Sequence, residues 1–231
     1  MVQVNSEKIF LRVRFHKTGR LQYVSHLDLV RTMNKIIVRA DLPLWYTEGF
    51  NPKPKMIFAA PLSIGTESHA ELMDIRLTER IEPSEALRRL NANMTGELFA
   101  VEAYYPETKF TDMRWLSYEI AVKTDGADQA LAERCNTALN EDKMEIVKKT
   151  KSGEATVDIR PLVKSGAARL EGDFLRIDCL LSADPSSFLN PEYIIKLLKD
   201  RCSILSSPDL TSEYYSILRT EGYFADMRAF R

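Results

Sequence analysis

The sequence predicts an α+β fold made of two similar halves, and three observations carry this prediction. Residues 8–15 alternate between apolar and mostly charged side chains, which is typical of a strand with one buried face. Residues 26–40 then place apolar side chains at helical spacing. The order that begins here, β-α-β-β-α-β, occurs again after residue 115. We therefore expect two tandem ferredoxin-like halves with antiparallel sheets.

The first helix begins after Ser25, a residue type that caps helices, and it ends before Pro43. Asp28 lies in its first turn, where a negative charge favours the positive end of the helix dipole. The side chains that we expect to face the sheet are Leu27, Val30, Ile37 and Ala40. The other elements expected in this half are strands at 56–60, 71–78 and 97–105 and a helix from 83.

The second half repeats this order and adds an insertion. Its expected strands are 116–123, 144–149, 174–181 and 214–219, and its expected helices are 129–139 and a helix from 190. A hairpin-like insertion is predicted at Glu154–Arg169. The predicted domains are a basic N-terminal domain, 1–106, and a C-terminal domain, 115–231.

Composition favours a globular protein of the cytoplasm. The 231 residues are 45% hydrophobic and 28% charged. No run approaches the roughly 20 apolar residues that a membrane-spanning helix needs, and the first residues do not resemble an export signal. The three cysteines, Cys135, Cys179 and Cys202, are widely spaced, which predicts buried free thiols.

Several kinds of catalytic centre are excluded by missing motifs. The sequence has no GxGxxG or GxxxxGK[ST] loop and no HExxH motif. Its three histidines do not have metal-ligand spacing, and its cysteines form no CxxC pair. We therefore expect no metal site, no cofactor bound by this chain and no catalytic activity of its own.

Positive charge is concentrated at the N-terminal end. Residues 1–60 contain ten Lys and Arg against four Asp and Glu, whereas the remainder contains 22 against 29. Arg31, Lys35 and Arg39, spaced by four, form a stripe on the first helix. Cations near aromatic rings are what binding of single-stranded RNA requires. The alternative is a solvated helix face whose nearby rings cover a core edge.

The predicted binding residues lie on this helix and in the segments on either side of it. The loop at 49–55 contains two prolines, which exclude a helix interior or a central strand. The binding residues are Lys17, Arg20, Ser25, His26, Asp28, Arg31, Lys35, Arg39, Phe50, Asn51, Lys53 and Lys55.

Two weaker features concern titratable groups. His16 and His26 would form an acid-base pair if the first strand and helix bring them together, as in a metal-independent ribonuclease. Asp74 and Arg76, two residues apart on one strand, are expected to form a surface ion pair.

The sequence resembles a bacterial family of unknown function, the radical-SAM-linked proteins. The resemblance is carried by FHKTGRLQYVSHLDLVRT and LPLWYTEGFNPKPKMIFAAPLSIGTESHAELMDIRL, and more weakly by TVDIRPLV and ILRTEGYF. Ser25, His26, Asp28 and Arg31 match one family phrase, and residues 49–54 match the other. Neither phrase has an established catalytic role.

The resemblance implies a partnership with a radical SAM protein, encoded beside such chains or fused to them. The iron-sulfur cluster and SAM are then expected on the partner, because a cluster needs three closely spaced cysteines. The gene surroundings of the family point to RNA metabolism. We therefore expect a non-catalytic accessory that binds or presents an RNA substrate. The alternatives are a metal-independent endoribonuclease of the tandem ferredoxin-like kind and a pure protein-docking module.

Overall fold

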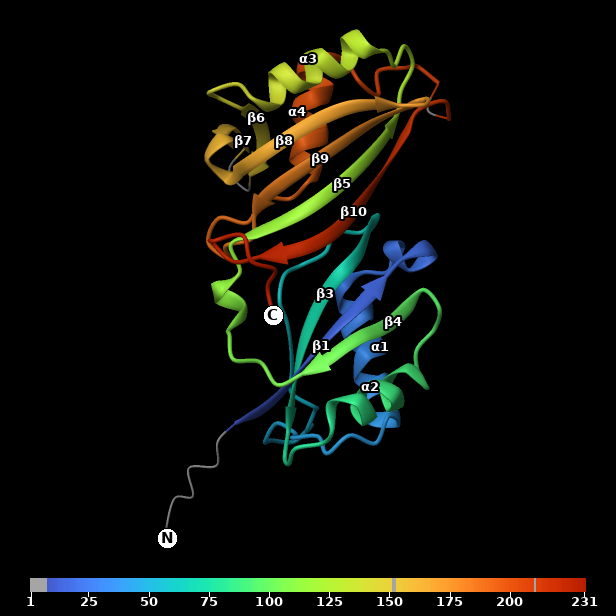
Figure 1. Ribbon diagram of the computed structural model, residues 1–231, viewed down its shortest axis with the longest axis vertical. Coiled ribbons are helices and arrows are strands. Elements are labelled where there is room, and N and C mark those ends of the chain that lie inside the picture. The colour runs from blue at the N-terminus through green and yellow to red at the C-terminus, as the bar shows by residue number, and fades with distance from the viewer. Residues whose placement is uncertain (1–7, 151–152, 210) are drawn as a thin grey trace. The chain divides into compact units, whose positions relative to one another are not determined.

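The computed structural model describes residues 8–150, 153–209 and 211–231 (Figure 1). The chain divides into two compact units. The N-terminal unit extends to Phe110 and includes Arg231, and the C-terminal unit comprises Thr111–Phe230. Within the described ranges, strands are combined with four α-helices, so the α+β class is confirmed. None of these helices is long and apolar enough to cross a membrane.

The N-terminal unit has its elements in the predicted order. They are β1 (Ile9–Lys17), α1 (His26–Arg39), β2 (Met56–Phe58), β3 (Thr66–Leu77), α2 (Pro83–Asn91) and β4 (Leu98–Tyr104). The strands pair antiparallel in the order β4-β1-β3, and β2 also pairs antiparallel with β3. The core lies on the face of this sheet that α1 and α2 cover (Figure 1).

Alternation along β1 separates two faces with different chemistry. Leu11, Val13 and Phe15 are buried in the core beneath the helices. Successive side chains of a strand point to opposite faces. Arg12 and His16 therefore lie on the face that the helices do not cover.

Helix α1 begins as predicted, but one of its expected core residues is exposed. Asp28 N–H donates to the Ser25 hydroxyl, which caps the helix. The buried side chains are Leu29, Met33, Ile36 and Ile37. Leu27 is 58% exposed, because two residues of a helix differ by about 200° in direction and Leu29 faces the core. Its assignment to the sheet-facing side was wrong.

The expected ion pair between Asp74 and Arg76 is also wrong. Asp74 lies directly opposite Arg12 on β1, and the Arg12 guanidinium donates to its two carboxylate oxygens at 2.7 and 2.9 Å. Directly paired residues on neighbouring strands are closer than residues two apart on one strand. Arg76 instead stacks on the Trp45 ring, with its guanidinium carbon 3.7 Å from the ring centroid.

The C-terminal unit contains one larger sheet and one hairpin. Its elements are β5 (Trp115–Lys123), α3 (Gln129–Leu139), β6 (Glu145–Thr150), β7 (Gly153–Asp158), β8 (Val163–Glu171), β9 (Phe174–Ser182), α4 (Glu192–Cys202) and β10 (Tyr214–Tyr223). The larger sheet has the order β10-β5-β9-β8, with antiparallel pairs. Among the residues that the structure describes, strands β6 and β7 pair only with each other.

The predicted position of the insertion was wrong. The separate hairpin is β6-β7, and β8, which begins nine residues after the predicted start of the insertion, belongs to the larger sheet. Contacts with helix α3 explain why β8 belongs to the larger sheet. The Asn136 side chain on α3 donates to the Ala168 carbonyl at 2.6 Å and accepts from its N–H at 2.7 Å. These bonds satisfy backbone groups of β8 that the neighbouring strand β9 does not.

Candidate nucleic-acid interface

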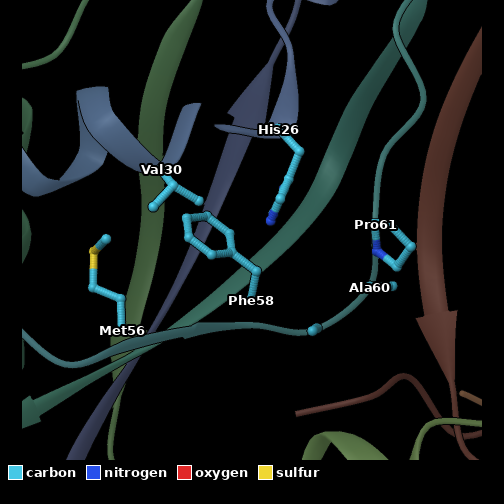
Figure 2. Close-up of a pocket in the computed structure, with 7 residues that line it drawn as sticks. His26, Val30, Met56, Phe58, Ala60 and Pro61 are labelled. Atoms are coloured by element: carbon cyan, nitrogen blue, oxygen red, sulfur yellow. The ribbon is translucent and has the colours of Figure 1, made fainter. Parts of the chain in front are cut away.

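A cavity of about 320 Å³ lies between the first turns of α1 and strand β2 (Figure 2). Its lining residues are His26, Val30, Met56, Phe58, Ala59, Ala60 and Pro61. The His26 ring meets the Phe58 ring edge-on, with 5.3 Å between their centroids, and Figure 2 shows it directed toward the phenyl ring. Apart from His26, the lining carries no ionisable side chain. The cavity thus combines apolar walls and an aromatic ring with one imidazole.

Ser25, Asp28 and Arg31 form a local network at the start of α1. The Ser25 hydroxyl donates to one Asp28 carboxylate oxygen at 2.8 Å, and Arg31 donates to the other at 2.9 Å. These two hydrogen bonds lower the pKa of Asp28. The network stabilises the positive end of the helix, so Arg31 is already partly neutralised.

Four other predicted cations have no such partner. Lys35 and Arg39 are exposed on α1, and Lys53 and Lys55 are exposed before β2. Within the part of the chain that the structure describes, none of these four side chains has a carboxylate or hydrogen-bond partner. We call these four residues the unpaired cations. Their charges are available to an anionic ligand.

The cations and the cavity are continuous in sequence. Arg31 directly follows Val30, which lines the cavity from α1, and Lys55 directly precedes Met56, which lines it from β2. The segments that carry the cations thus include or adjoin the two elements that line the cavity.

The segment between Thr47 and Lys53 forms a closed loop with an exposed aromatic ring. Thr47 N–H donates to the Lys53 carbonyl at 2.9 Å, and Lys53 N–H donates to the Thr47 hydroxyl at 3.1 Å. Gly49 has a φ of +121°, which other residue types rarely adopt. The loop presents Phe50 fully exposed, with Asn51 also exposed beside it.

Lys17 and Arg20 are placed differently from each other. Lys17 is only 2% exposed, and its ammonium group donates to the Gln22 carbonyl at 3.2 Å. Arg20 is exposed, with its guanidinium 3.7 Å from the Glu97 carboxylate. Lys17 is therefore not part of the exposed surface, whereas Arg20 remains on it.

The proposed pairing of His16 with His26 is not formed. His26 lies over Phe58, which packs edge-on against Phe15 on the helix-covered face. His16 follows Phe15 in β1 and points to the other face. There it stacks on His69 of β3, with 4.5 Å between the ring centroids, and also contacts Phe99.

His69 is the residue that sequence analysis missed. The β1-β3 register shifts between residues 15 and 17, so simple alternation gives no signal that His69 faces His16. Burial, the nearby His69 and Arg14 all lower the pKa of His16. His16 is therefore poised to be a neutral imidazole at neutral pH.

The described residues include no group of three or more side chains able to hold a metal ion. The three cysteines are free and buried, as predicted. Burial raises the pKa of Cys179 to about 12, and burial together with the neighbouring Cys202 raises that of Cys135 to about 12. The thiols of Cys135 and Cys179 are thus neutral, and all three cysteines are buried in the C-terminal unit.

The comparisons with known proteins bear on the family and the fold. A family model described as "Uncharacterized protein conserved in bacteria (DUF2344)" matches residues 11–191. No curated protein matches the sequence. A chain of a Cbf5-Nop10-Gar1 complex superposes with a TM-score of 0.51 at 11% identity, over 92% of this chain and 48% of that one. This chain thus spans about half of that relative, and the likeness concerns the fold alone.

A second solved structure is similar over a comparable length. It is an unknown protein from Galdieria sulphuraria, 10% identical, and the match covers 92% of this chain and 99% of that one. Its TM-score is only 0.26, so nothing about this chain follows from it.

Proposed function

The chain belongs to the bacterial family DUF2344, and we propose that it is a non-catalytic accessory that binds single-stranded RNA and presents it to a separate radical SAM enzyme. The observation that carries this proposal is the set of unpaired cations on α1 and before β2, the two elements that also line the His26–Phe58 cavity. Cations that neutralise phosphates, together with a ring on which a base can stack, are the two components of single-strand recognition.

The cavity supplies the second component, an aromatic ring on which a base can stack. At about 320 Å³ it is near the lower end of the range for small-ligand sites, about 300–1,000 Å³. One unpaired base could lie against the Phe58 ring, with the His26 imidazole at its edge. The exposed Phe50 ring on the neighbouring loop supplies a further stacking or docking surface.

The partner enzyme is proposed because the sequence resembles radical-SAM-linked proteins, and the cysteines of this chain are unsuited to hold a cluster. A radical SAM enzyme binds its iron-sulfur cluster through closely spaced cysteine thiolates. Here the cysteines are buried on three different elements, α3, β9 and α4. A cluster and SAM on another chain would supply the chemistry, and this chain would supply the substrate.

We also propose that both units are versions of the ferredoxin-like fold. Numbered within its own unit, each larger sheet is built from the fourth, first, third and second strand in that order, once the β6-β7 hairpin is treated as an insertion. That order supports a tandem repeat of the split β-α-β motif.

The experiment that tests the accessory role is isolation of the complex. Co-expressed with the radical SAM protein encoded beside it, the chain should copurify with that protein and with RNA. Ultraviolet crosslinks to RNA should be concentrated between Arg31 and Lys55, because the unpaired cations lie there. A complex that contains no RNA, or crosslinks confined to residues 111–230, would contradict the proposal.

A metal-independent ribonuclease is the second candidate, and the His16–His69 stack favours it. A neutral His16 beside a second imidazole could share proton transfer in RNA cleavage. If so, single-stranded RNA should be cleaved in EDTA, and His16→Ala or His69→Ala should slow cleavage by about 100-fold or more. His26→Ala should have no effect, since His26 lies on the opposite face.

The pH dependence of cleavage is a separate test. Since the pKa of His16 is lowered, activity should persist as the pH falls to 6.5, the ordinary pKa of histidine. Intact RNA after prolonged incubation would remove this candidate.

A further inference from the structure

A second cavity of the N-terminal unit, of about 460 Å³, is strongly cationic. Its lining residues are Lys8, Ile9, Trp45, Arg76, Leu77, Thr78 and Arg80. Three of these seven are basic and none is acidic. None of them belongs to the interface described above, so this cavity requires its own explanation.

The first wall of the cavity is built where the chain before the 47–53 loop runs beside the end of β3. Trp45 N–H donates to the Arg76 carbonyl at 3.0 Å, and Arg76 N–H donates to the Lys55 carbonyl at 3.0 Å. These bonds fix the Trp45 backbone beside β3. The Arg76 guanidinium lies on the indole ring, 3.7 Å from its centroid.

The second wall presents Arg80 in a similar way. Its guanidinium lies 4.4 Å from the centroid of the Tyr105 ring. The Tyr105 hydroxyl donates to the Ile81 carbonyl and accepts from the Ile81 N–H, both at 2.8 Å. The ring is therefore held in place by the residue that follows Arg80. Each arginine thus lies on an aromatic ring that is held in place, Trp45 through its backbone and Tyr105 through its hydroxyl.

A guanidinium that stacks on an aromatic ring keeps its N–H donors free at its edge. Within the described part of the chain, neither Arg76, Arg80 nor Lys8 has a side-chain hydrogen bond or a carboxylate partner. Two guanidinium groups and one ammonium group around the same cavity are complementary to a compact anion with several oxygens.

We propose that this cavity binds a phosphate monoester, in particular that of a nucleoside 5′-monophosphate. Its two negative charges match the cationic lining, its oxygens accept from the arginine forks, and the indole of Trp45 offers an aromatic surface to the base. The volume lies within the range of small-ligand sites, about 300–1,000 Å³. The same phosphate could come from a free nucleotide or from the 5′ end of an RNA.

Fluorescence of Trp45 measures this binding directly. Because the chain has two tryptophans, the titrations use the full chain with Trp115→Phe. AMP should change the emission of Trp45 saturably, and adenosine, which lacks the phosphate, should not. Arg80→Gln should weaken AMP binding by about tenfold or more, the loss expected for charge-assisted hydrogen bonds.

Two controls separate this site from general charge and from the interface. Arg88→Gln removes the same charge from an exposed arginine of α2 and should leave AMP binding unchanged. Lys35→Gln should weaken RNA binding but not AMP binding, so the two proposals can fail independently. If only an oligonucleotide with a 5′-phosphate binds in an Arg80-dependent way, the RNA end is the source. Equal binding of AMP and adenosine, or no effect of Arg80→Gln on either phosphorylated ligand, would overturn the proposal.

Discussion

Replacement of Asp74 by alanine is expected to destabilise the N-terminal unit by about 3–5 kcal/mol, the usual cost of removing one partner of a buried ion pair. The Arg12 side chain is 0% exposed, and Asp74 accepts two hydrogen bonds from it. Without the carboxylate, Arg12 loses both of these bonds and keeps its bonds to Thr108 and its contact with the Phe110 ring. The buried positive charge of Arg12 would then lack the carboxylate that faces it.

The pKa of Asp74 indicates how the pair can be replaced. Burial raises this pKa, and the bonds from Arg12 oppose the rise without cancelling it. Because the folded-state pKa lies above the ordinary value of 3.8, the folded state binds the proton more tightly. The contribution of this group to stability therefore falls as pH rises between the two values. A carboxyl with that behaviour is costly to keep ionised, so an apolar pair of similar size should be tolerated.

Urea unfolding monitored by Trp45 fluorescence, with Trp115→Phe in every variant, measures both effects. Arg12→Met combined with Asp74→Leu should recover most of the stability that Asp74→Ala loses. The matched control is Glu85→Ala on α2, which removes a partly exposed carboxylate from its ion pairs with Arg88 and Arg89 and should change stability little. A small effect of Asp74→Ala would mean that the pair is not required for folding.

Elements specified by neighbouring residues could be predicted from the sequence. The cap formed by Ser25 and Asp28 and the loop at 49–55 depend on hydrogen bonds and dihedral angles over a few positions. The exposed position of Phe50 follows from the same local chemistry.

Contacts that depend on strand register could not be predicted. The Arg12–Asp74 pair joins residues 62 positions apart, and the His16–His69 stack depends on a register shift. Likewise, 144–149 and 163–171 both have a strand pattern, and contacts with helix α3, such as the bonds of Asn136 to β8, accompany the strand that joins the larger sheet. Alternation identifies a strand but does not specify its partner.

Replacing all four unpaired cations by glutamine should nearly abolish binding of single-stranded RNA. For single strands, each neutralised phosphate contributes about −0.7 to the slope of log affinity against log salt. Four contacts should thus contribute about −2.8, which corresponds to an affinity loss on the order of 10³-fold at 50 mM salt. Fluorescence anisotropy of a labelled oligonucleotide at several salt concentrations gives both quantities. The substitutions are Lys35→Gln, Arg39→Gln, Lys53→Gln and Lys55→Gln.

A control with the same change in net charge shows whether position or total charge is responsible. Four exposed cations that already have carboxylate partners are replaced by glutamine instead, namely Arg88, Lys143, Arg169 and Arg228. Each of these charges is offset by its neighbour, so their loss should reduce affinity far less and leave the slope near that of the unmodified chain. Equal losses in the two variants would mean that RNA responds to net charge rather than to this surface. If only the variant that lacks the unpaired cations loses most of its RNA affinity, the phosphates bind along helix α1 and the segment before β2.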